Sequence, residues 1–424
     1  MLQAMRDALP MIDDTMLPAL LLLAAGALLA GVRAALARAA RQKLVRDVAA
    51  WTPASAPERL RRLSFTVIVN PGGSGAGRGE MLLRCVVSPM LVRAGVQHEV
   101  IRTKGAGHAR QICAELSPSS PGHSRVVLCV SGDGMVHEAL NGLLSGSKAG
   151  APRTDALLAV VPAGSGNGVC ASLYGRAASH DPVAVMARIL DGAAPQPIDV
   201  MAMRYLDEDS GGGGGGSGGR ARTRSQASFV FDLHFVCWAI FSDHDYLVEG
   251  PLRRLGPLVK LAIAPIAVLL RLRCHRGVCD FAPVAPEPAH AAAYSDAAAL
   301  PVCPDEPSMR RLEGDFLCWA LGNLSEAGGD ACATPHVKQA EGAADLLICR
   351  SVPGLGRLSQ RHVLFKLLDR MGSGRHVPAP QLEYYKTARL VLRPKSGHLQ
   401  LSGQEVRRGP VEVVVHRAAI EVLM

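Results

Sequence analysis

Three glycine-rich segments, each directly after a short apolar run, constrain the fold of this chain most strongly. They are residues 70–77 (NPGGSGAG), 131–134 (SGDG) and 162–167 (PAGSGN). Glycine allows positive φ and close approach of the backbone, so successive N–H groups can converge on phosphate oxygens. One such loop would be weak evidence, because glycines after strands are common in turns. Three at the same edge of one sheet predict a phosphate-binding α/β domain.

The segments around these loops alternate between strand and helix patterns. Strand-like runs fall at residues 64–69, 98–102, 126–130 and 156–161, and helical patterns at about 80–92, 108–116, 135–144 and 182–190. Strands that are almost wholly apolar are typical of a parallel sheet covered on both faces. The alternation therefore predicts a doubly wound, parallel α/β domain that ends near Arg204.

The second half of the chain has a different pattern. A glycine run between residues 206 and 228 predicts a linker. Strand-like segments follow at 229–236, 315–321, 345–349, 388–392, 398–401 and 411–415, with helices expected at 258–272 and 358–371. We predict a leader and basic linker (1–60), the α/β domain (61–205), the glycine-rich linker (206–228) and a mostly antiparallel β domain (229–424) with a Pro- and Ala-rich insertion near 282–307.

The N-terminal leader carries an apolar stretch from residue 16 to residue 32, followed by basic residues from Arg33 to Arg46. A membrane-spanning helix needs about 20 apolar residues, so this stretch is at the short edge of that range. Acidic residues precede it and basic residues follow it, which by the positive-inside rule keeps the rest of the chain in the cytosol. The sequence predicts a membrane anchor, with an amphipathic leader as the alternative.

The formal net charge of +9 indicates an anionic partner, either nucleic acid or a membrane surface. Only 4% of the residues are aromatic and no interleaved stacking platform occurs, so we expect the membrane and no nucleic acid. The 11 cysteines are scattered singly, and the spacing of Cys274 and Cys279 fits neither a zinc site nor a redox motif. Reduced thiols in a cytosolic compartment are therefore expected.

The loop around Asp133 is the strongest candidate for chemistry. None of the three loops is a Walker loop or a dinucleotide fingerprint, because the Gly-Lys-Ser/Thr ending and the acidic ribose partner are missing. Phosphoryl transfer needs positioning, charge neutralisation and a base that takes the proton of the attacking hydroxyl. Asp133, between Gly132 and Gly134, suits that role or the organisation of Mg²⁺. The structural alternative is an N-cap of the following helix.

Residues 131–142 (SGDGMVHEALNG) and 162–167 (PAGSGN) resemble the sphingosine kinases, which belong to the diacylglycerol-kinase catalytic superfamily. The Ser-Gly-Asp-Gly and Ala-Gly-Ser-Gly-Asn spellings favour the sphingosine branch. The resemblance runs from about Phe65 to the C-terminus, with breaks at the two low-complexity insertions. It implies ATP and Mg²⁺ as cofactors, a sphingoid long-chain base as the lipid substrate, and an active site in the cleft between an N-terminal nucleotide-binding domain and a C-terminal lipid-binding domain.

The resemblance also implies roles for individual residues. Asp133 would be catalytic, and Asp245, with Asp243 beside it, would bind the head group of the base. A solvated loop is the alternative for both of these aspartates. The residues implied at the nucleotide are Asn70, Pro71, Gly72, Gly73, Ser74, Gly75, Thr103, Ser131, Gly132, Gly134, Glu138, Gly164, Ser165, Gly166, Asn167, Arg253, Gly403, Gln404 and Glu405.

Two departures and two alternatives remain open at this point. The family's C-terminal Asp-Gly-Glu is Ser-Gly-Gln-Glu at residues 402–405, so either Gln404 or Glu405 replaces the usual glutamate. The apolar stretch 259–270 is either a core helix or the lip of a hydrophobic channel. A diacylglycerol or ceramide kinase is the nearest alternative function, and a catalytically inactive lipid-binding protein is the alternative from another class. The sequence leaves room for a homodimer.

Overall fold

The computed structural model describes the backbone of residues 16–53, 60–71, 77–117, 119, 123–145, 156–206, 229–249, 257–351 and 354–424. Within these ranges, the side chains of residues 16–30, 33, 145, 249 and 257–262 lie outside the description. Four predicted loop residues (Gly72, Gly73, Ser74 and Gly75), the predicted Arg253 and most of the glycine-rich linker also lie outside it.

Four parallel strands form the first half of the fold, in the order β2-β1-β3-β4. They are β1 (Leu63–Val69), β2 (Gln97–Arg102), β3 (Ser124–Ser131) and β4 (Ala156–Pro162), and β4 is buried along its whole length. The helices are α4 (Arg78–Leu82), α5 (Ser88–Arg93), α6 (His108–Glu115), α7 (Asp133–Ser145), α8 (Gly168–Tyr174) and α9 (Pro182–Asp191). The predicted β-α alternation is confirmed, with a π-helical segment (Leu83–Val87) joining α4 to α5.

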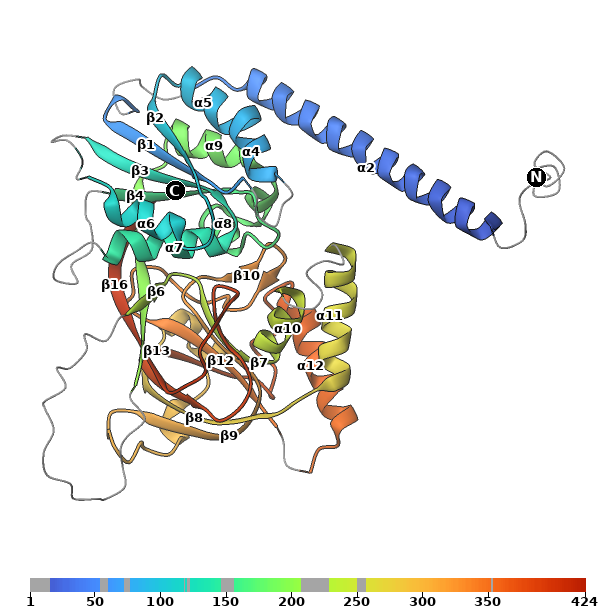
Figure 1. The fold of residues 1–424 in the computed structure, drawn as a ribbon. Coiled ribbons are helices and arrows are strands. Elements are labelled where there is room, and N and C mark those ends of the chain that lie inside the picture. Colours follow the sequence, from blue (N-terminus) through green and yellow to red (C-terminus); the bar gives the residue numbers. More distant parts are fainter. Residues whose placement is uncertain are drawn as a thin grey trace, which may run out of the picture.

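The second half is mainly antiparallel. Its strands are β5 (Pro195–Tyr205), β6 (Val230–Asp232), β7 (Phe235–Ala239), β8 (His275–Pro283), β9 (Arg310–Gly322), β12 (Ala344–Arg350), β13 (Glu383–Pro394), β14 (Leu399–Leu401), β15 (Gln404–Val406) and β16 (Val411–Leu423). A separate pair, β10 (Glu326–Gly328) and β11 (Ala331–Cys332), forms a small hairpin. Three helices lie beside this half, α10 (Ile240–Glu249), α11 (Pro257–Arg271) and α12 (Arg357–Met371) (Figure 1).

Strand β16 joins the two halves into one sheet of 14 strands. Its first part pairs antiparallel with β13, and its last residues pair in parallel with β4 at Glu421 and Val422. An irregularity at Ala418, which has a φ of 51°, lies between these two parts. Ile420 and Val422 consequently belong to the core around β1–β4, although most of the C-terminal residues pack in the cores of the antiparallel half.

One local prediction and one alternative need correction. The strand expected at 229–236 is two strands, β6 and β7, separated by Leu233 and His234. The segment after β7, which includes Asp243 and Asp245, is helix α10 and not a solvated loop. The alternation of apolar and polar residues does not distinguish one strand from two that pair with different partners, which is why the break could not be read from the sequence.

The predicted apolar leader forms the first part of α2 (Met16–Ala50), which extends away from the rest of the chain in Figure 1. The inner end of this helix is held by Arg93, which donates to the carbonyl of Val48 at 2.7 Å. No helix among the residues that were described in full is long and apolar enough to cross a membrane. Because most side chains of residues 16–32 lie outside the description, the anchor stays a prediction.

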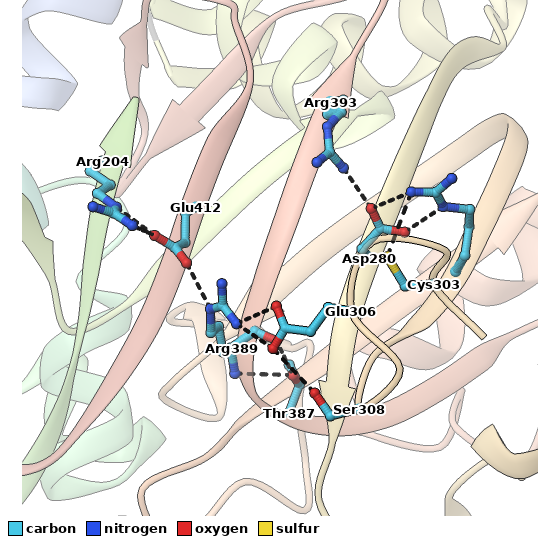
Figure 2. A network of polar contacts seen from close by, with 10 residues as sticks. Arg204, Asp280, Cys303, Glu306, Ser308, Thr387, Arg389, Arg393 and Glu412 are labelled. Atoms are coloured by element: carbon cyan, nitrogen blue, oxygen red, sulfur yellow. Dashed lines mark hydrogen bonds and ion pairs between the residues drawn. The ribbon is translucent and has the colours of Figure 1, made fainter. Parts of the chain in front are cut away.

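A network of ion pairs crosses one face of the antiparallel half, and Figure 2 shows its two buried carboxylates. Glu412 on β16 is only 4% exposed and pairs with Arg204 and, at 2.7 Å, with Arg389. Asp280 on β8 receives Arg311 at 2.7 Å and Arg393. Burial alone would raise the pKa of Glu412, but the hydrogen bonds from Arg389 and Arg204 hold that pKa below its ordinary value. The network therefore ties β5, β13 and β16 together.

We predict that Glu412→Gln lowers the free energy of unfolding by about 1–3 kcal/mol at pH 7, because two partly buried arginines lose their shared carboxylate. A carboxyl with a depressed folded pKa stabilises the fold above its unfolded pKa of about 4.3 and loses that contribution as the pH falls further. Denaturant unfolding at pH 7 and near pH 3 should show the difference from wild type shrinking in acid. Glu115→Gln, an exposed position, is the control, and an equal loss in both variants would contradict the prediction.

Candidate active site

A cavity of about 1260 Å³ lies where the glycine-rich loops meet the helices of the antiparallel half. One side of its wall is polar backbone from the loops after β1, β3 and β4. The other side is apolar and comes from β7, α10, α11 and α12. The predicted site residues that line it are Asn70, Pro71, Thr103, Ser131, Gly132, Asp133, Gly134, Glu138, Gly164, Ser165, Gly166, Asp245, Gly403, Gln404 and Glu405. The structure therefore brings most of the predicted site together.

The second and third glycine loops touch each other through their backbones. A Cβ atom added at Gly164 would lie 2.5 Å from the Cα of Gly132, and one added at Gly132 would lie 3.0 Å from the Cα of Gly164. Neither glycine has a positive φ, so close approach is the reason that both positions are glycine. The contact places the ends of β3 and β4 against each other at the cavity wall.

Asp133 is held in place by the start of helix α8. Its two carboxylate oxygens accept hydrogen bonds from the backbone N–H groups of Gly168 at 2.9 Å and Val169 at 3.0 Å. These are N–H groups that a helix start leaves without an intrahelical partner. The sequence offered Asp133 as an N-cap of the helix that follows it, α7. In the structure its side chain instead caps the start of α8. The carboxylate is consequently oriented while still facing the cavity.

The β14–β15 hairpin, near the C-terminal end of the sequence, forms another part of the cavity wall. Ser402 donates to Asp232 at 2.8 Å, and Ser402 and Gly403 both have positive φ, as a tight turn requires. Gln404 then reaches the start of α7 and donates to the carbonyl of Gly134 at 3.4 Å. Glu405 also lines the cavity, and its carboxylate pairs with His398 at 2.6 Å. Of the two candidates for the usual glutamate position, Gln404 is the one that contacts the Asp133 loop.

Helix α10 explains why only one of the two predicted head-group aspartates reaches the cavity. Phe241, His244, Asp245 and Val248 line it, at the i, i+3, i+4 and i+7 spacing of one helix face. Asp243 lies on another face, where its carboxylate is 2.9 Å from Nε2 of the buried His275. The structure does not bring Asp243 to the cavity.

Asn167 also lies behind the cavity wall and not on it. Its side-chain oxygen accepts from the N–H of Gly164 at 2.9 Å, and its amide donates to the carbonyls of Gly164 and Ser179. Its φ of 53° is in the left-handed region that asparagine tolerates better than most residues. Asn167 therefore shapes the third loop.

Sequence reasoning missed two cations on the cavity wall, Arg78 and Lys104. Arg78 is half-buried, burial lowers the pKa of its guanidinium, and no carboxylate of the described residues forms an ion pair with it. It follows the first glycine loop directly and begins α4, and Lys104 follows the predicted Thr103. The sequence could have indicated these two cations only by their position next to predicted site residues. A single Arg or Lys gives no such indication by itself, because isolated cations are common on any protein surface.

A cluster of three or more His, Cys, Asp or Glu side chains that could hold a metal is not found among the fully described residues. Two carboxylates from the first two turns of α7, Asp133 and Glu138, line the cavity beside the glycine-rich loops. Glu138 also accepts a hydrogen bond from the N–H of Ala109 at 3.3 Å. Asp330 lines the cavity next to the third loop, where the N–H of Gly329 donates to the carbonyl of Gly166 at 2.8 Å.

Residues 64–203 match the diacylglycerol kinase catalytic domain. The chain is 25% identical over 381 residues to Sphingosine kinase 1 of Arabidopsis thaliana, covering 82% of this chain and 70% of that one. It is 26% identical over 370 residues to Sphingosine kinase 1 of Homo sapiens, covering 81% and 86%. Together these matches support a lipid kinase of the sphingosine-kinase-like type. The match spans β1 to β5, so the three loops of this lipid kinase lie inside the catalytic domain.

A solved structure shows the same fold. A diacylglycerol kinase from Bacillus anthracis str. Sterne superposes with a TM-score of 0.55, covering 85% of this chain and 96% of that one at 16% identity. At this identity the likeness concerns the fold and not the substrate. Because 85% of this chain is covered, the superposition includes strands of both the parallel and the antiparallel halves, which Figure 1 shows.

We predict that Gly164→Ala lowers kinase activity at least about tenfold and the free energy of unfolding by about 1–3 kcal/mol, because the new methyl group must push the two loops apart. Thermal unfolding and phosphate transfer from labelled ATP would measure the two effects. Gly192→Ala is the matched control, since a Cβ there meets nothing within 4 Å. Equal behaviour of the two variants would show that the loop contact is dispensable.

Proposed function

We propose that this chain transfers the γ-phosphate of ATP to the primary hydroxyl of a sphingoid long-chain base, which gives the 1-phosphate. The supporting observation is one cavity whose wall changes from glycine backbone to apolar side chains, with Asp133 and Asp245 on it. Such a wall suits a nucleotide at one end and a hydrocarbon tail at the other. The relatives named sphingosine kinase support the same substrate class.

Asp133 is the proposed base. It takes the proton of the substrate hydroxyl as the oxygen forms a bond to the γ-phosphorus, while the bond from that phosphorus to the β–γ bridging oxygen of ATP breaks. The hydrogen bonds from Gly168 and Val169 fix the position of the carboxylate before the substrate arrives. Backbone N–H groups of the loops, together with Arg78 and Lys104, bind the phosphate oxygens.

Mg²⁺ would accompany the nucleotide and neutralise phosphate charge during transfer. This ion is usually held by one or two carboxylates together with substrate phosphates and water. Asp133 and Glu138 are two carboxylates beside the loops that fit this requirement. Glu138 is the better candidate for a metal ligand, because Asp133 as a base must keep a lone pair for the proton while its oxygens accept hydrogen bonds from Gly168 and Val169.

Asp245 is the proposed partner of the ammonium group of the base. It lies on α10 between the loops and the apolar wall, and His244 is 3.0 Å from its carboxylate. The tail would extend along Phe241, Val248 and the inner faces of α11 and α12. The stretch 259–270 would then act both as packing helix and as channel wall, since Pro265 and Val268 line the cavity.

We also propose that residues 61–205 and 229–424 act as two domains, with the active site between them. Two separate hydrophobic cores support this division, and β5 passes between them, since Ile198 and Val200 pack in the first core and Met201 and Met203 in the second. Strand β16 pairs with β4 of the first domain and with β13 of the second.

We predict that Asp133→Asn reduces kcat at least about 100-fold with sphingosine, because general-base catalysis contributes about 10²–10⁴-fold. Asp245→Asn should reduce kcat/KM for sphingosine about 10–100-fold, the size of one charge-assisted hydrogen bond, while any turnover of ceramide or diacylglycerol changes little. Labelled ATP with each of the three lipids measures both effects.

The control is Asp369→Asn, an exposed carboxylate on α12 outside the cavity. Product that persists unchanged with Asp133→Asn would remove the proposed base. Preferred phosphorylation of ceramide or diacylglycerol would establish the alternative lipid kinase. Absence of product from the wild type with all three lipids would contradict the proposed function and favour the alternative of a catalytically inactive protein.

We propose that the enzyme works at the cytoplasmic face of a membrane, since its substrate resides in the bilayer and basic residues follow the apolar leader. Deletion of residues 1–46 should then move the protein from the membrane fraction to the supernatant after cell fractionation. Replacing the same residues with a polar linker controls for chain length. If the deletion leaves the protein in the membrane fraction, the leader does not anchor it.

A further inference from the structure

The buried Asp232, at the end of β6, joins three parts of the chain behind the wall of the active-site cavity. Its side chain is 1% exposed. One carboxylate oxygen accepts the N–H of His234 at 2.7 Å, and the hydroxyl of Ser402 donates to the carboxylate, with its oxygen 2.8 and 2.9 Å from the two acceptors. His137 of α7 faces the same carboxylate, with Nδ1 3.5 Å from Oδ2. Asp232 therefore connects β6 with α7 and with the turn between β14 and β15.

The carboxylate and the turn depend on each other. A buried carboxylate needs hydrogen bonds in place of its hydration shell, and the hydroxyl of Ser402 supplies one of them. Hydrogen bonds to a charged acceptor are about twice as strong as those between neutral groups. The contact therefore holds the turn where the carboxylate of Asp232 lies.

The turn relies on this contact because β15 is an edge strand. Among the described strands, β15 pairs with β14 alone. Strand β14 is anchored by β7, and the N–H of Ser402 donates to the carbonyl of Phe235 at 3.0 Å. The chain then turns through two left-handed residues, with φ of 45° at Ser402 and 74° at Gly403. The hydroxyl of Ser402 ties this turn to β6.

The position of the turn determines where Gln404 lies. A Cβ added at Gly134 would be 3.0 Å from Nε2 of Gln404, so the carboxamide packs against the residue that follows Asp133. The hydrogen bond from this nitrogen to the carbonyl of Gly134 is 3.4 Å long, which makes it weak. Gly403 and Gln404 both line the cavity. The placement of the carboxamide beside Asp133 therefore depends on the stronger contact at Ser402.

Strand β6 also holds the helix that Asp133 begins. Asn141 of α7 is 3% exposed, donates to the carbonyl of Phe231 at 2.7 Å and accepts the N–H of Phe231 at 2.9 Å (Figure 1). Phe231 directly precedes Asp232. Two consecutive residues of β6 therefore hold α7 and the turn, and so set the distance between them.

We propose that Asp232 is a positioning residue, which holds the β14–β15 turn through Ser402 and thereby presents the carboxamide of Gln404 to the nucleotide beside Asp133. A carboxamide has an acceptor oxygen and two N–H donors, which suit the hydroxyls of a ribose. The family's Asp-Gly-Glu is Ser-Gly-Gln at residues 402–404, so in this chain the turn carries the hydroxyl and β6 the carboxylate. The contact with the nucleotide rests on the proposed function, whereas the placement of the turn does not.

Binding of Mg·ADP to the full chain, measured by calorimetry without lipid, tests this role. Ser402→Ala removes only the hydroxyl of a half-buried side chain and should raise the Kd of ADP about tenfold, as expected for one hydrogen bond to a charged group. At saturating ATP, kcat with sphingosine should change less than about twofold, because the loss concerns binding and not the transfer step. Ser402→Asp should raise the Kd further, since it sets a second carboxylate against Asp232.

The exchanged pair Ser402→Asp/Asp232→Ser distinguishes positioning from a general loss of stability. Aspartate tolerates the left-handed φ at position 402, and a serine hydroxyl on β6 can donate to it. The Kd of ADP should therefore return to within about threefold of the wild type, although Ser402→Asp alone binds weakly. The matched control is Ser308→Ala, which removes a hydroxyl that donates to Glu306 at 3.1 Å outside the cavity and should leave the Kd unchanged.

Hydrogen exchange of residues 402–406 reports the placement of the turn directly. It should be faster in Ser402→Ala than in the wild type and slow again in the exchanged pair. Equal Kd values for Ser402→Ala and Ser308→Ala would overturn the proposal, and so would an exchanged pair that binds ADP as weakly as Ser402→Asp. If the wild type binds no ADP, the proposed function fails, and the exchange rates then decide whether Asp232 places the turn.

Discussion

The contact between Gly132 and Gly164 is the constraint on which the site depends. It sets the ends of β3 and β4 close enough for Asp133, after β3, to bind the first N–H groups of α8, which follows β4. A side chain at either glycine would separate the two loops and with them the carboxylate from the helix start. One backbone approach therefore fixes both the shape of the edge at which the glycine-rich loops meet and the direction of the carboxylate proposed to act there.

The wall of the cavity is completed by residues that are distant in sequence from the glycine-rich loops. The hairpin at residues 402–405 reaches back to α7, and α10, α11 and α12 supply the apolar wall opposite the loops. The antiparallel half that carries these elements is tied to the parallel half by β16, which pairs with strands of both. Its buried Glu412 joins Arg204 and Arg389 across three strands, so the network in Figure 2 stabilises the same connection.

Side chains of α11 and α12 form part of the apolar cavity wall, through Pro265 and Val268 on one helix and Leu368 and Met371 on the other. Both helices also expose apolar side chains, among them Leu270 and Phe365. On α12 the cavity wall and the exposed surface adjoin, because Leu368 follows Phe365 by one helical turn.

The sequence by itself determined the glycine loops, the β-α alternation and the position of Asp133, because these depend on neighbouring residues and on strand and helix periods. The three loops on which the prediction was built do meet, as far as they are described, at one edge of the sheet. Only the tertiary structure decided the rest. It separated Asp245 from Asp243, since residues two apart on a helix face different sides. It also brought Gln404 against Gly134 and placed Arg78 on the cavity wall, because such contacts arise when segments far apart in the chain pack together.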